Sequence, residues 1–241
     1  MAVAVIQARM GSTRLPGKVV RPLGPTTVLG WVARAASCSG AVDEVVVATS
    51  TAAGDDAVVA EAERLGCAVA RGSEDDVLAR FVTAVEGHAD DATVVRLTAD
   101  CPLLDPALIA LAVRSFEGGD AEYLSTTLVR TLPRGLDVEV TTAGALRAID
   151  PVATGAERVH VTPHLYLHPE RHRVAGLVFA PSADDLRLTL DTEEDAALIE
   201  AVVAALGDGP HPWRALVGLL RARPDLAALN AGIRQKTLDE G

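Results

Sequence analysis

The sequence predicts an α/β fold with a mainly parallel sheet. Runs of valine, isoleucine and leucine recur between amphipathic stretches, which is the pattern of strands that alternate with helices. Residues 93–97 are apolar or β-branched at nearly every position, as in a central strand that is buried on both faces. The 241 residues suffice for one α/β core, and no internal repeat or low-complexity linker interrupts the succession. We therefore expect a single domain over residues 1–241.

The first half of the chain carries strands and helices in regular alternation. Asp105 is a suitable N-cap for the last of these helices, and Pro106 suits its first turn because proline lacks an N–H that this turn would leave unpaired. We expect strands at residues 2–7, 44–49, 68–70 and 93–97, and helices at residues 27–37, 55–65, 75–86 and 106–116.

From about residue 123 the pattern becomes less regular. Residues 136–140 alternate like a strand, two helical stretches follow, and residues 173–179 and 186–190 resemble later strands. We interpret this region as an insertion followed by a return to the same sheet. The expected C-terminal elements are helices at residues 191–206 and 213–220, within a helical tail over 207–241.

Composition and charge exclude several classes of protein. Acidic side chains outnumber basic ones by 33 to 22 and aromatic residues make up only 3%, which disfavours a nucleic-acid partner. The longest apolar runs, such as residues 107–113, are far shorter than the ~18 residues of a membrane span. No export signal is visible at the N-terminus, so we expect a soluble cytoplasmic protein without a membrane partner. Cys38, Cys67 and Cys101 lack the spacing of a disulfide framework or a zinc site, and we expect reduced thiols.

Residues 7–18 follow the first predicted strand and have the character of an anion-binding loop. Arg9, Arg14 and Lys18 alternate with glycine, serine and threonine, so side-chain charges and closely spaced backbone N–H groups can converge on one polyanion. The first 42 residues contain five Arg or Lys and no Asp or Glu, although the whole chain has a net charge of −11. A nucleoside triphosphate fits this loop; a solvated basic turn after an edge strand is the alternative.

Two other phosphate-binding motifs do not fit this loop. A P-loop has four residues between its glycines and a Ser or Thr after its lysine, whereas five residues separate Gly11 from Gly17 and Val19 follows Lys18. The dinucleotide-binding pattern Gly-x-Gly-x-x-Gly is also absent from the loop. Neither a P-loop ATPase nor a dehydrogenase is favoured.

Two aspartates follow predicted strands and are candidates for a metal site. Asp100 lies just beyond strand 93–97, and Asp191 follows strand 186–190 in the same way. Ligands bind at the carboxyl ends of strands in open α/β sheets, and one or two carboxylates with phosphate oxygens suit Mg2+. The alternatives are a turn residue for Asp100 and a helix cap for Asp191.

Three histidines have the spacing of zinc ligands on one face of a helix, namely His160, His164 and His168. Val161 stands where the zincin signature has its glutamate, and Pro163 interrupts the turn between the first two histidines. We therefore expect a structural role for these histidines.

Residues 6–19 resemble the opening motif of a cytidylyltransferase family that includes the spore coat polysaccharide biosynthesis cytidylyltransferases; CMP-Kdo and CMP-sialic acid synthetases are more distant relatives. Residues 97–106 resemble the family's metal-aspartate motif, although Ala99 stands where glycine is more common, and residues 187–195 resemble its later acidic motif. The resemblance implies a three-layer α/β/α, Rossmann-like fold of the nucleotide-diphospho-sugar transferase type, with a mixed, mainly parallel sheet. It also implies a small insertion at about residues 125–180 for acceptor binding or dimerisation, and a homodimer.

The resemblance assigns roles to individual residues. The nucleotide-binding residues would be Ala8, Arg9, Gly11, Ser12, Arg14, Lys18, Thr49, Ser73 and Arg80. The acceptor-binding residues would be Arg134, Asp137, Glu139, Arg158 and His160. Asp100 and Asp191 would hold Mg2+, and the catalytic residues would be Arg9, Lys18 and Asp100. A purely structural alternative stays open for two of these segments. Residues 72–80 can equally be a loop and a helix N-terminus, and residues 137–139 can be a solvated strand face.

The function we expect is a Mg2+-dependent transfer of CMP from CTP to an anionic acceptor, which is a sugar acid, a sugar phosphate or a phosphonate. The acceptor's own oxygen would attack the α-phosphorus and pyrophosphate would leave, so no covalent enzyme intermediate is needed. One alternative is a glycosyltransferase that uses a nucleotide sugar, which is disfavoured because the usual Asp-x-Asp is missing near Asp100. The other is a nucleotide-binding module without activity.

Overall fold

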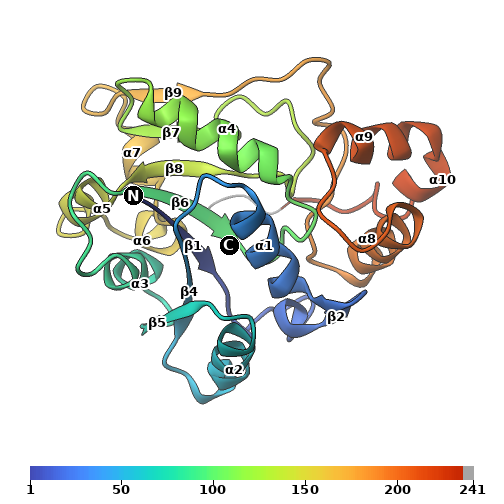
Figure 1. Ribbon diagram of the computed structural model, residues 1–241, viewed down its shortest axis with the longest axis horizontal. Coiled ribbons are helices and arrows are strands. Elements are labelled where there is room, and N and C mark those ends of the chain that lie inside the picture. Colours follow the sequence, from blue (N-terminus) through green and yellow to red (C-terminus); the bar gives the residue numbers. More distant parts are fainter. Residues whose placement is uncertain (236–241) are drawn as a thin grey trace.

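The computed structural model describes residues 1–235, which are arranged around one mixed sheet (Figure 1). Within these residues the sheet has seven strands in the order β5-β4-β1-β6-β8-β7-β9. Four strands are parallel to one another: β1 (Ala2–Gln7), β4 (Glu44–Ser50), β5 (Ala68–Gly72) and β6 (Thr93–Thr98). The other three are β8 (Glu139–Thr142), antiparallel to β6, β7 (Tyr123–Ser125), antiparallel to β8, and β9 (Val174–Gly176), parallel to β7. A small hairpin of β2 (Pro22–Leu23) and β3 (Thr26–Thr27) lies apart from this sheet.

Helices cover both faces of the sheet. Alternate side chains of β1 enter two separate cores, Ala4 and Ile6 on one face and Val3 and Val5 on the other. The first layer contains α1 (Val28–Cys38), α2 (Asp56–Arg64) and α4 (Pro106–Glu117). The second contains α3 (Val77–Ala84), α5 (Ala143–Ile149), α6 (Ala156–His160) and α7 (Pro163–Leu167). This arrangement confirms the predicted three-layer α/β/α fold.

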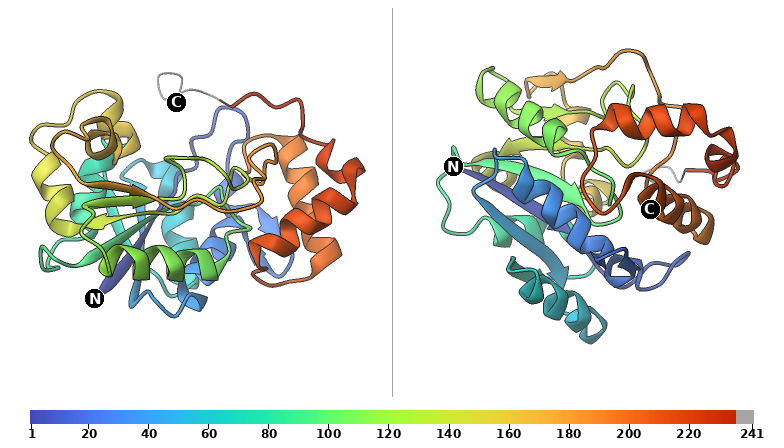
Figure 2. Two further views of the ribbon diagram at one scale, coloured as in Figure 1. Left: turned by 90° about the horizontal axis from the view of Figure 1, so that it is seen from above. Right: turned by 45° about the vertical axis from the view of Figure 1, so that its right-hand side comes forward.

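The C-terminal helices form one end of the molecule. Figure 2 shows them, in orange and red, at the end opposite the yellow helices α5 to α7. They are α8 (Glu193–Leu206), α9 (Trp213–Ala222) and α10 (Pro224–Ala227). None of the helices within residues 1–235 has both the length and the apolar character that crossing a membrane requires.

The predicted elements of the first half are confirmed to within two residues at each end. Asp105 caps α4 as expected, because its side chain accepts a hydrogen bond from the Ala107 N–H at 2.8 Å, and Pro106 occupies the first turn. The helices predicted at residues 191–206 and 213–220 correspond to α8 and α9.

Residues 186–190 do not form the predicted strand. The segment is extended, but within residues 1–235 it forms a single bridge, between Arg187 and Arg134. The Leu188 N–H donates to the Arg134 carbonyl at 2.6 Å, and the Leu190 N–H donates to the Asp100 carbonyl at 2.8 Å. Because these acceptors belong to two different loops and not to one strand, no continuous ladder forms. The segment instead ties two loops together beside the end of β6.

Two other predicted strands are shorter than expected, and three short strands, β2, β3 and β7, were not predicted. β8 begins only at Glu139, because the backbone at Leu136 and Val138 is hydrogen-bonded by the side chain of Thr126. The strand predicted at residues 173–179 is limited to β9, and three-residue β7 is too short to produce a recognisable alternation.

Candidate active site

A cleft of about 840 Å3 opens at the carboxyl ends of β1 and β6. The register pairs Gln7 with Thr98, and the Ala99 N–H donates to the Gln7 carbonyl at 3.0 Å, so the loops that follow the two strands leave the sheet side by side. This is the edge at which open α/β sheets bind ligands. The predicted site residues that line the cleft are Ala8, Arg9, Gly11, Ser12, Arg14, Lys18, Asp100, Arg134, Asp137, His160 and Asp191.

Asp55 fixes the loop that follows β1. Its buried carboxylate accepts hydrogen bonds from the N–H groups of Met10 at 2.6 Å and Ser50 at 3.2 Å. Burial alone would raise the pKa of Asp55, but these hydrogen bonds hold it below its usual value. The Met10 carbonyl accepts from the Gly17 N–H at 3.1 Å, and Gly17 has a φ of 71°, which favours glycine. Sequence reasoning missed Asp55, because no local pattern signals a contact across 45 positions.

Lys18 lies between the two predicted metal ligands. Its Nζ donates to Oδ2 of Asp100 at 2.9 Å, to Oδ1 of Asp191 at 2.7 Å and to the Leu190 carbonyl at 2.8 Å, so all three ammonium hydrogens are used. Burial alone would lower the pKa of Lys18, but the two carboxylates raise it above its usual value. Burial alone would likewise raise the pKa of Asp100, and the lysine charge lowers it. The two carboxylates therefore form a place where a cation is stabilised.

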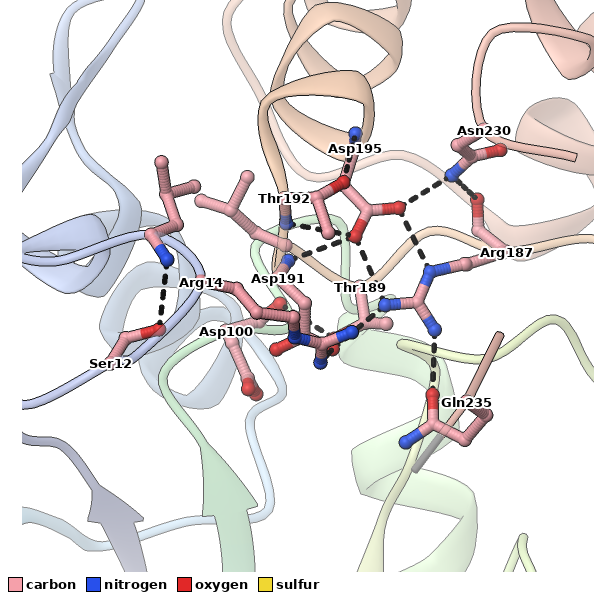
Figure 3. A network of polar contacts seen from close by, with 12 residues as sticks. Ser12, Arg14, Asp100, Arg187, Thr189, Asp191, Thr192, Asp195, Asn230 and Gln235 are labelled. Atoms are coloured by element: carbon pink, nitrogen blue, oxygen red, sulfur yellow. Dashed lines mark hydrogen bonds and ion pairs between the residues drawn. The ribbon is translucent and has the colours of Figure 1, made fainter. Parts of the chain in front are cut away.

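A buried network holds Asp191 in position (Figure 3). Oδ2 of Asp191 lies 2.7 Å from Nη2 of Arg187 and 3.1 Å from Nη2 of Arg14. Arg187 donates from Nε and Nη2 to the two carboxylate oxygens of the fully buried Asp195, at 2.8 Å and 3.0 Å. Asn230 donates to the same carboxylate at 2.8 Å. Burial alone would raise the pKa of Asp195, but Arg187 and Asn230 lower it. Sequence reasoning missed the roles of Arg187, Asp195 and Asn230.

The cap of α8 is a different residue from the one considered in the sequence. Thr192 Oγ1 accepts from the Asp195 N–H at 3.3 Å, and the Asp195 carboxylate accepts from the Thr192 N–H at 3.2 Å, which is a capping box. Asp191 is thus not needed as the helix cap, and its side chain faces the cations of the cleft.

The two arginines of the β1 loop are the more exposed cations of the cleft. The Arg9 side chain is 43% exposed and pairs loosely with Glu74 at 3.7 Å, and the Arg14 side chain is 30% exposed. Ser12 Oγ accepts from the Leu15 N–H at 3.2 Å, which stabilises the turn that carries Arg14. These side chains are available to an anionic ligand with little disruption of the fold.

The opposite wall of the cleft is also basic. Arg130 is held by Asp137 through two hydrogen bonds of 2.8 Å and 3.1 Å. Within residues 1–235 the nearby Arg134 guanidinium has no carboxylate partner, and its pKa is lowered by burial and by the charge of Arg130. Two neighbouring guanidinium groups, one of them unneutralised, favour an anion on this side of the cleft.

Glu139 does not share the position of Asp137, contrary to the expected strand face. It is buried, and its oxygens accept hydrogen bonds from Arg96, from the Thr162 hydroxyl and from the Tyr123 hydroxyl at 2.8 Å. Asp137 lies before β8, so the alternation that would place the two acids on one side does not apply.

Four further predicted site residues do not line the cleft. Arg158 binds Asp76 at 2.7 Å and Asp150 at 2.8 Å, and Ser73 Oγ accepts from the Asp76 N–H at 3.3 Å. Arg80 is fully buried rather than solvent-facing, and none of its three nitrogens has a hydrogen-bond partner among the described residues. Thr49 is also fully buried, and its side chain is among the groups that lower the pKa of Asp55.

Comparison with known proteins identifies the family. A family model described as cytidylyltransferase matches residues 3–202. The spore coat polysaccharide biosynthesis protein SpsF of Bacillus subtilis is 37% identical over 233 residues, which cover 92% of this chain and 95% of the relative. A 3-deoxy-manno-octulosonate cytidylyltransferase of Mesorhizobium japonicum is 31% identical over 192 residues, covering 73% and 79% of the two chains.

Solved structures agree with this relationship. A cytidylyltransferase from Leptospira borgpetersenii superposes with a TM-score of 0.89 at 30% identity and covers 98% of this chain and 99% of its own. The fold of a CMP:2-keto-3-deoxy-manno-octonic acid synthetase complexed with CTP is similar, with a TM-score of 0.64 at 18% identity, over 85% of this chain and 98% of that one. The chain belongs to the cytidylyltransferase family and is a nucleotidyltransferase.

Proposed function

We propose that this enzyme catalyses the Mg2+-dependent transfer of CMP from CTP to an anionic acceptor. The products are a CMP conjugate and pyrophosphate. The observation that carries the proposal is the position of Lys18 between Asp100 and Asp191, at the end of a basic loop in the cleft. A new bond forms between an acceptor oxygen and the α-phosphorus of CTP, and the bond from that phosphorus to the pyrophosphate oxygen breaks.

Asp100 and Asp191 would hold Mg2+, since oxygen ligands are the ones that this ion prefers. The lysine ammonium already bound by both carboxylates supports this fit, because it marks a position where positive charge is stabilised. The ion would neutralise charge on the triphosphate and on the departing pyrophosphate. Arg9, Arg14 and Lys18 would bind the same phosphates through charge-assisted hydrogen bonds.

Direct attack by the acceptor is favoured over a covalent enzyme intermediate. Cys101 is the thiol that lines the cleft, and burial and the charge of Asp100 raise its pKa well above the usual value. A thiol in this state is a poor nucleophile at neutral pH, because the thiolate is the reactive form. The enzyme would therefore act by positioning the two substrates and stabilising charge.

The acceptor would be held by Arg134, with Asp137 and His160 on the same side of the cleft. The unneutralised guanidinium of Arg134 suits a carboxylate or a phosphate. Among the candidate acceptors, a sugar acid has the most support, since several relatives are named for 3-deoxy-manno-octulosonate and its 8-amino derivative. Glu139 and Arg158 would support the acceptor segment through their internal hydrogen bonds.

Arg80 and Thr49 remain in the proposal as nucleotide-binding residues. A buried guanidinium without hydrogen-bond partners is unfavourable, so a ligand that supplies acceptors would stabilise Arg80. Arg80 also packs tightly under Gly72, where an added Cβ would lie 2.8 Å from Arg80 Cγ. The pyrimidine carbonyl and ring nitrogen of cytosine are acceptors of the required kind. Ser73 belongs to the loop between β5 and α3, the helix that carries Arg80.

The proposal is tested by thermal stabilisation with CTP, UTP, GTP, ATP or dTTP, each with and without Mg2+. We expect a CTP-specific shift that needs Mg2+, that is lost in Asp100→Ala and that is weakened in Arg80→Met. Asp185→Ala, which removes an exposed partner of Arg221, is the matched control and should leave the shift unchanged. Pyrophosphate release with sugar acids would then identify the acceptor. Stabilisation by a nucleotide sugar but by no triphosphate would contradict the proposal and support the glycosyltransferase.

A further inference from the structure

A cluster of potential metal ligands lies outside the cleft, between α6, α7 and the turn that follows them. Glu157, His164 and His168 each offer one ligand atom, and these atoms all lie within 4.8 Å of one another. None of the three lines the cleft that contains Asp100 and Asp191. Figure 1 shows α6 and α7 together at the yellow end of the molecule, and Figure 2 places that end away from the C-terminal helices.

The distances within this cluster suit a tetrahedral ion. Nδ1 of His164 lies 3.1 Å from Oε2 of Glu157, and Nε2 of His168 lies 3.5 Å from Oε1, the other oxygen of that carboxylate. Ligands bound to Zn2+ at about 2.0–2.1 Å in a tetrahedron are about 3.3–3.4 Å apart. One oxygen of Glu157 and one nitrogen of each histidine lie within 4.8 Å of one another, so side-chain adjustment without movement of the backbone would bring them to this spacing.

Other groups orient the ligands as supporting residues do in metal sites. The second ring nitrogen of His168, Nδ1, faces Oε1 of Glu170 at 3.4 Å, which matches the carboxylate–histidine arrangement common behind zinc. The Thr154 N–H donates to Oε2 of Glu157 at 3.0 Å and fixes that carboxylate. The ring of His172 stands edge-on to His164, with a centroid distance of 5.9 Å.

A strained turn brings these ligands together. Val161 is fully buried with φ 75° and ψ −58°, and the Thr162 N–H donates to the His160 carbonyl at 3.0 Å, which defines the rarer, positive-φ form of the γ-turn. A β-branched residue rarely adopts this conformation, because it is strained, and it persists only where the surrounding structure holds it. The turn separates α6 from α7, so His160 faces the cleft while His164 reaches Glu157. The sequence analysis argued against zinc binding by His160, His164 and His168; in the fold, Glu157 and not His160 lies beside the other two histidines.

We propose that Glu157, His164 and His168 bind Zn2+ at a site separate from the Mg2+ site of the cleft. Imidazole nitrogen is a good ligand for zinc and a poor one for Mg2+, which prefers oxygen, so the chemistry of each site selects a different ion. The proposal does not depend on the reaction in the cleft, because it rests on contacts within α6, α7 and the following turn.

The test is a calorimetric titration of chelator-treated enzyme with Zn2+, followed by visible absorption of the Co2+-substituted protein. We expect one Zn2+ per chain, not displaced by excess Mg2+, and a tetrahedral Co2+ spectrum. His168→Ala should lose at least about tenfold in affinity, since even supporting residues contribute 10–100-fold. His168 is partly exposed and this variant should fold; Glu157→Gln, which preserves shape, should lose affinity similarly.

His211→Ala removes a half-buried histidine elsewhere and should bind Zn2+ like the wild type, as should Asp100→Ala. Failure of the wild type to bind Zn2+ would overturn the proposal, as would equal binding by His168→Ala. Loss of binding in Asp100→Ala alone would place the ion in the cleft instead. None of these outcomes depends on whether CTP is the substrate, so failure here is distinguishable from failure of the proposed function.

Discussion

The Lys18 ammonium lies 2.7 Å from Oδ1 of Asp191, a contact between residues 173 positions apart in the sequence. The same ammonium is shared with Asp100, at the end of β6. Three segments that are distant in the chain thus meet at one charged cluster on the carboxyl edge of the sheet. This cluster joins the basic loop to both candidate metal ligands.

Replacing Lys18 with methionine should reduce kcat/KM by at least about 100-fold, because the loss of one charge-stabilising donor in a catalytic site has effects of this size. The variant leaves Asp100 and Asp191 without their shared cation. We therefore also expect its melting temperature to rise more on addition of Mg2+ than that of the wild type. Lys18→Arg, which keeps the charge, is the control for the second effect; wild-type turnover in Lys18→Met would refute the assigned role.

The ionisation of Asp100 should be visible in the pH dependence of stability. Burial alone would raise the pKa of Asp100, but Lys18 holds it below the ordinary value of 3.8. A carboxylate with a lowered pKa stabilises the folded state above its unfolded pKa, and this contribution is lost as the pH falls through the folded value. The difference in free energy of unfolding between wild type and Asp100→Asn should be constant above pH 3.8 and shrink below it. Urea denaturation across the acid range measures it, and a pH-independent difference would contradict the assignment.

Breaking the support of Asp191 should destabilise the whole fold. Asp195 is fully buried and holds Arg187, so Asp195→Ala breaks this buried pair and leaves Arg187 only Asp191, which Lys18 and Arg14 also share. We expect a loss of about 3–5 kcal/mol in the free energy of unfolding. Asp185→Ala breaks an exposed pair with Arg221 and should change stability by less than about 1 kcal/mol. Denaturant unfolding of both variants measures the two losses in free energy of unfolding. Equal losses would contradict the prediction that the buried pair contributes more to stability than the exposed one.

Gly135 allows the segment before Asp191 to approach the Arg134 loop. It has a φ of 99°, and an added Cβ would lie 2.5 Å from the carbonyl carbon of Leu188 and 2.6 Å from the nitrogen of Thr189. Gly135→Ala should cost at least about 2 kcal/mol, because left-handed strain adds to a backbone clash. Gly209→Ala, where a Cβ would meet nothing within 4 Å, is the matched control. Thermal melting of the two variants decides the matter, and equal melting temperatures would refute this close approach.

We propose that the chain forms a homodimer through residues 154–179. This region exposes Leu167 at 55% and Val178 at 62%, and burial of these apolar side chains against a second copy would be favourable. Light scattering coupled to size exclusion should give twice the mass of one chain, and Leu167→Glu should shift it toward the monomer. A monomeric wild type would remove the proposal, and Val129→Glu, which is 57% exposed outside the region, is the control.

Local signals in the sequence determined the helices and strands of the first half and several site positions. Periodicity, the Asp105–Pro106 cap and the dense positive charge of the β1 loop depend on neighbouring residues and need no knowledge of distant contacts. Asp100 could be placed at a strand end for the same reason. Its partner Asp191 was found by the same argument, although the segment before it is not a strand.

Only the tertiary structure decided which groups are used inside the fold and which face the cleft. Glu139 and Asp137 are only two residues apart in the sequence. The Glu139 carboxylate is buried and accepts hydrogen bonds from Arg96, Tyr123 and Thr162, whereas Asp137 lines the cleft. The γ-turn at Val161 likewise turns the chain so that His164 lies beside Glu157, while His160 lines the cleft. The physical reason is that residues of the same type acquire different roles through partners many positions away, and a local pattern contains no information about which distant segment packs against it.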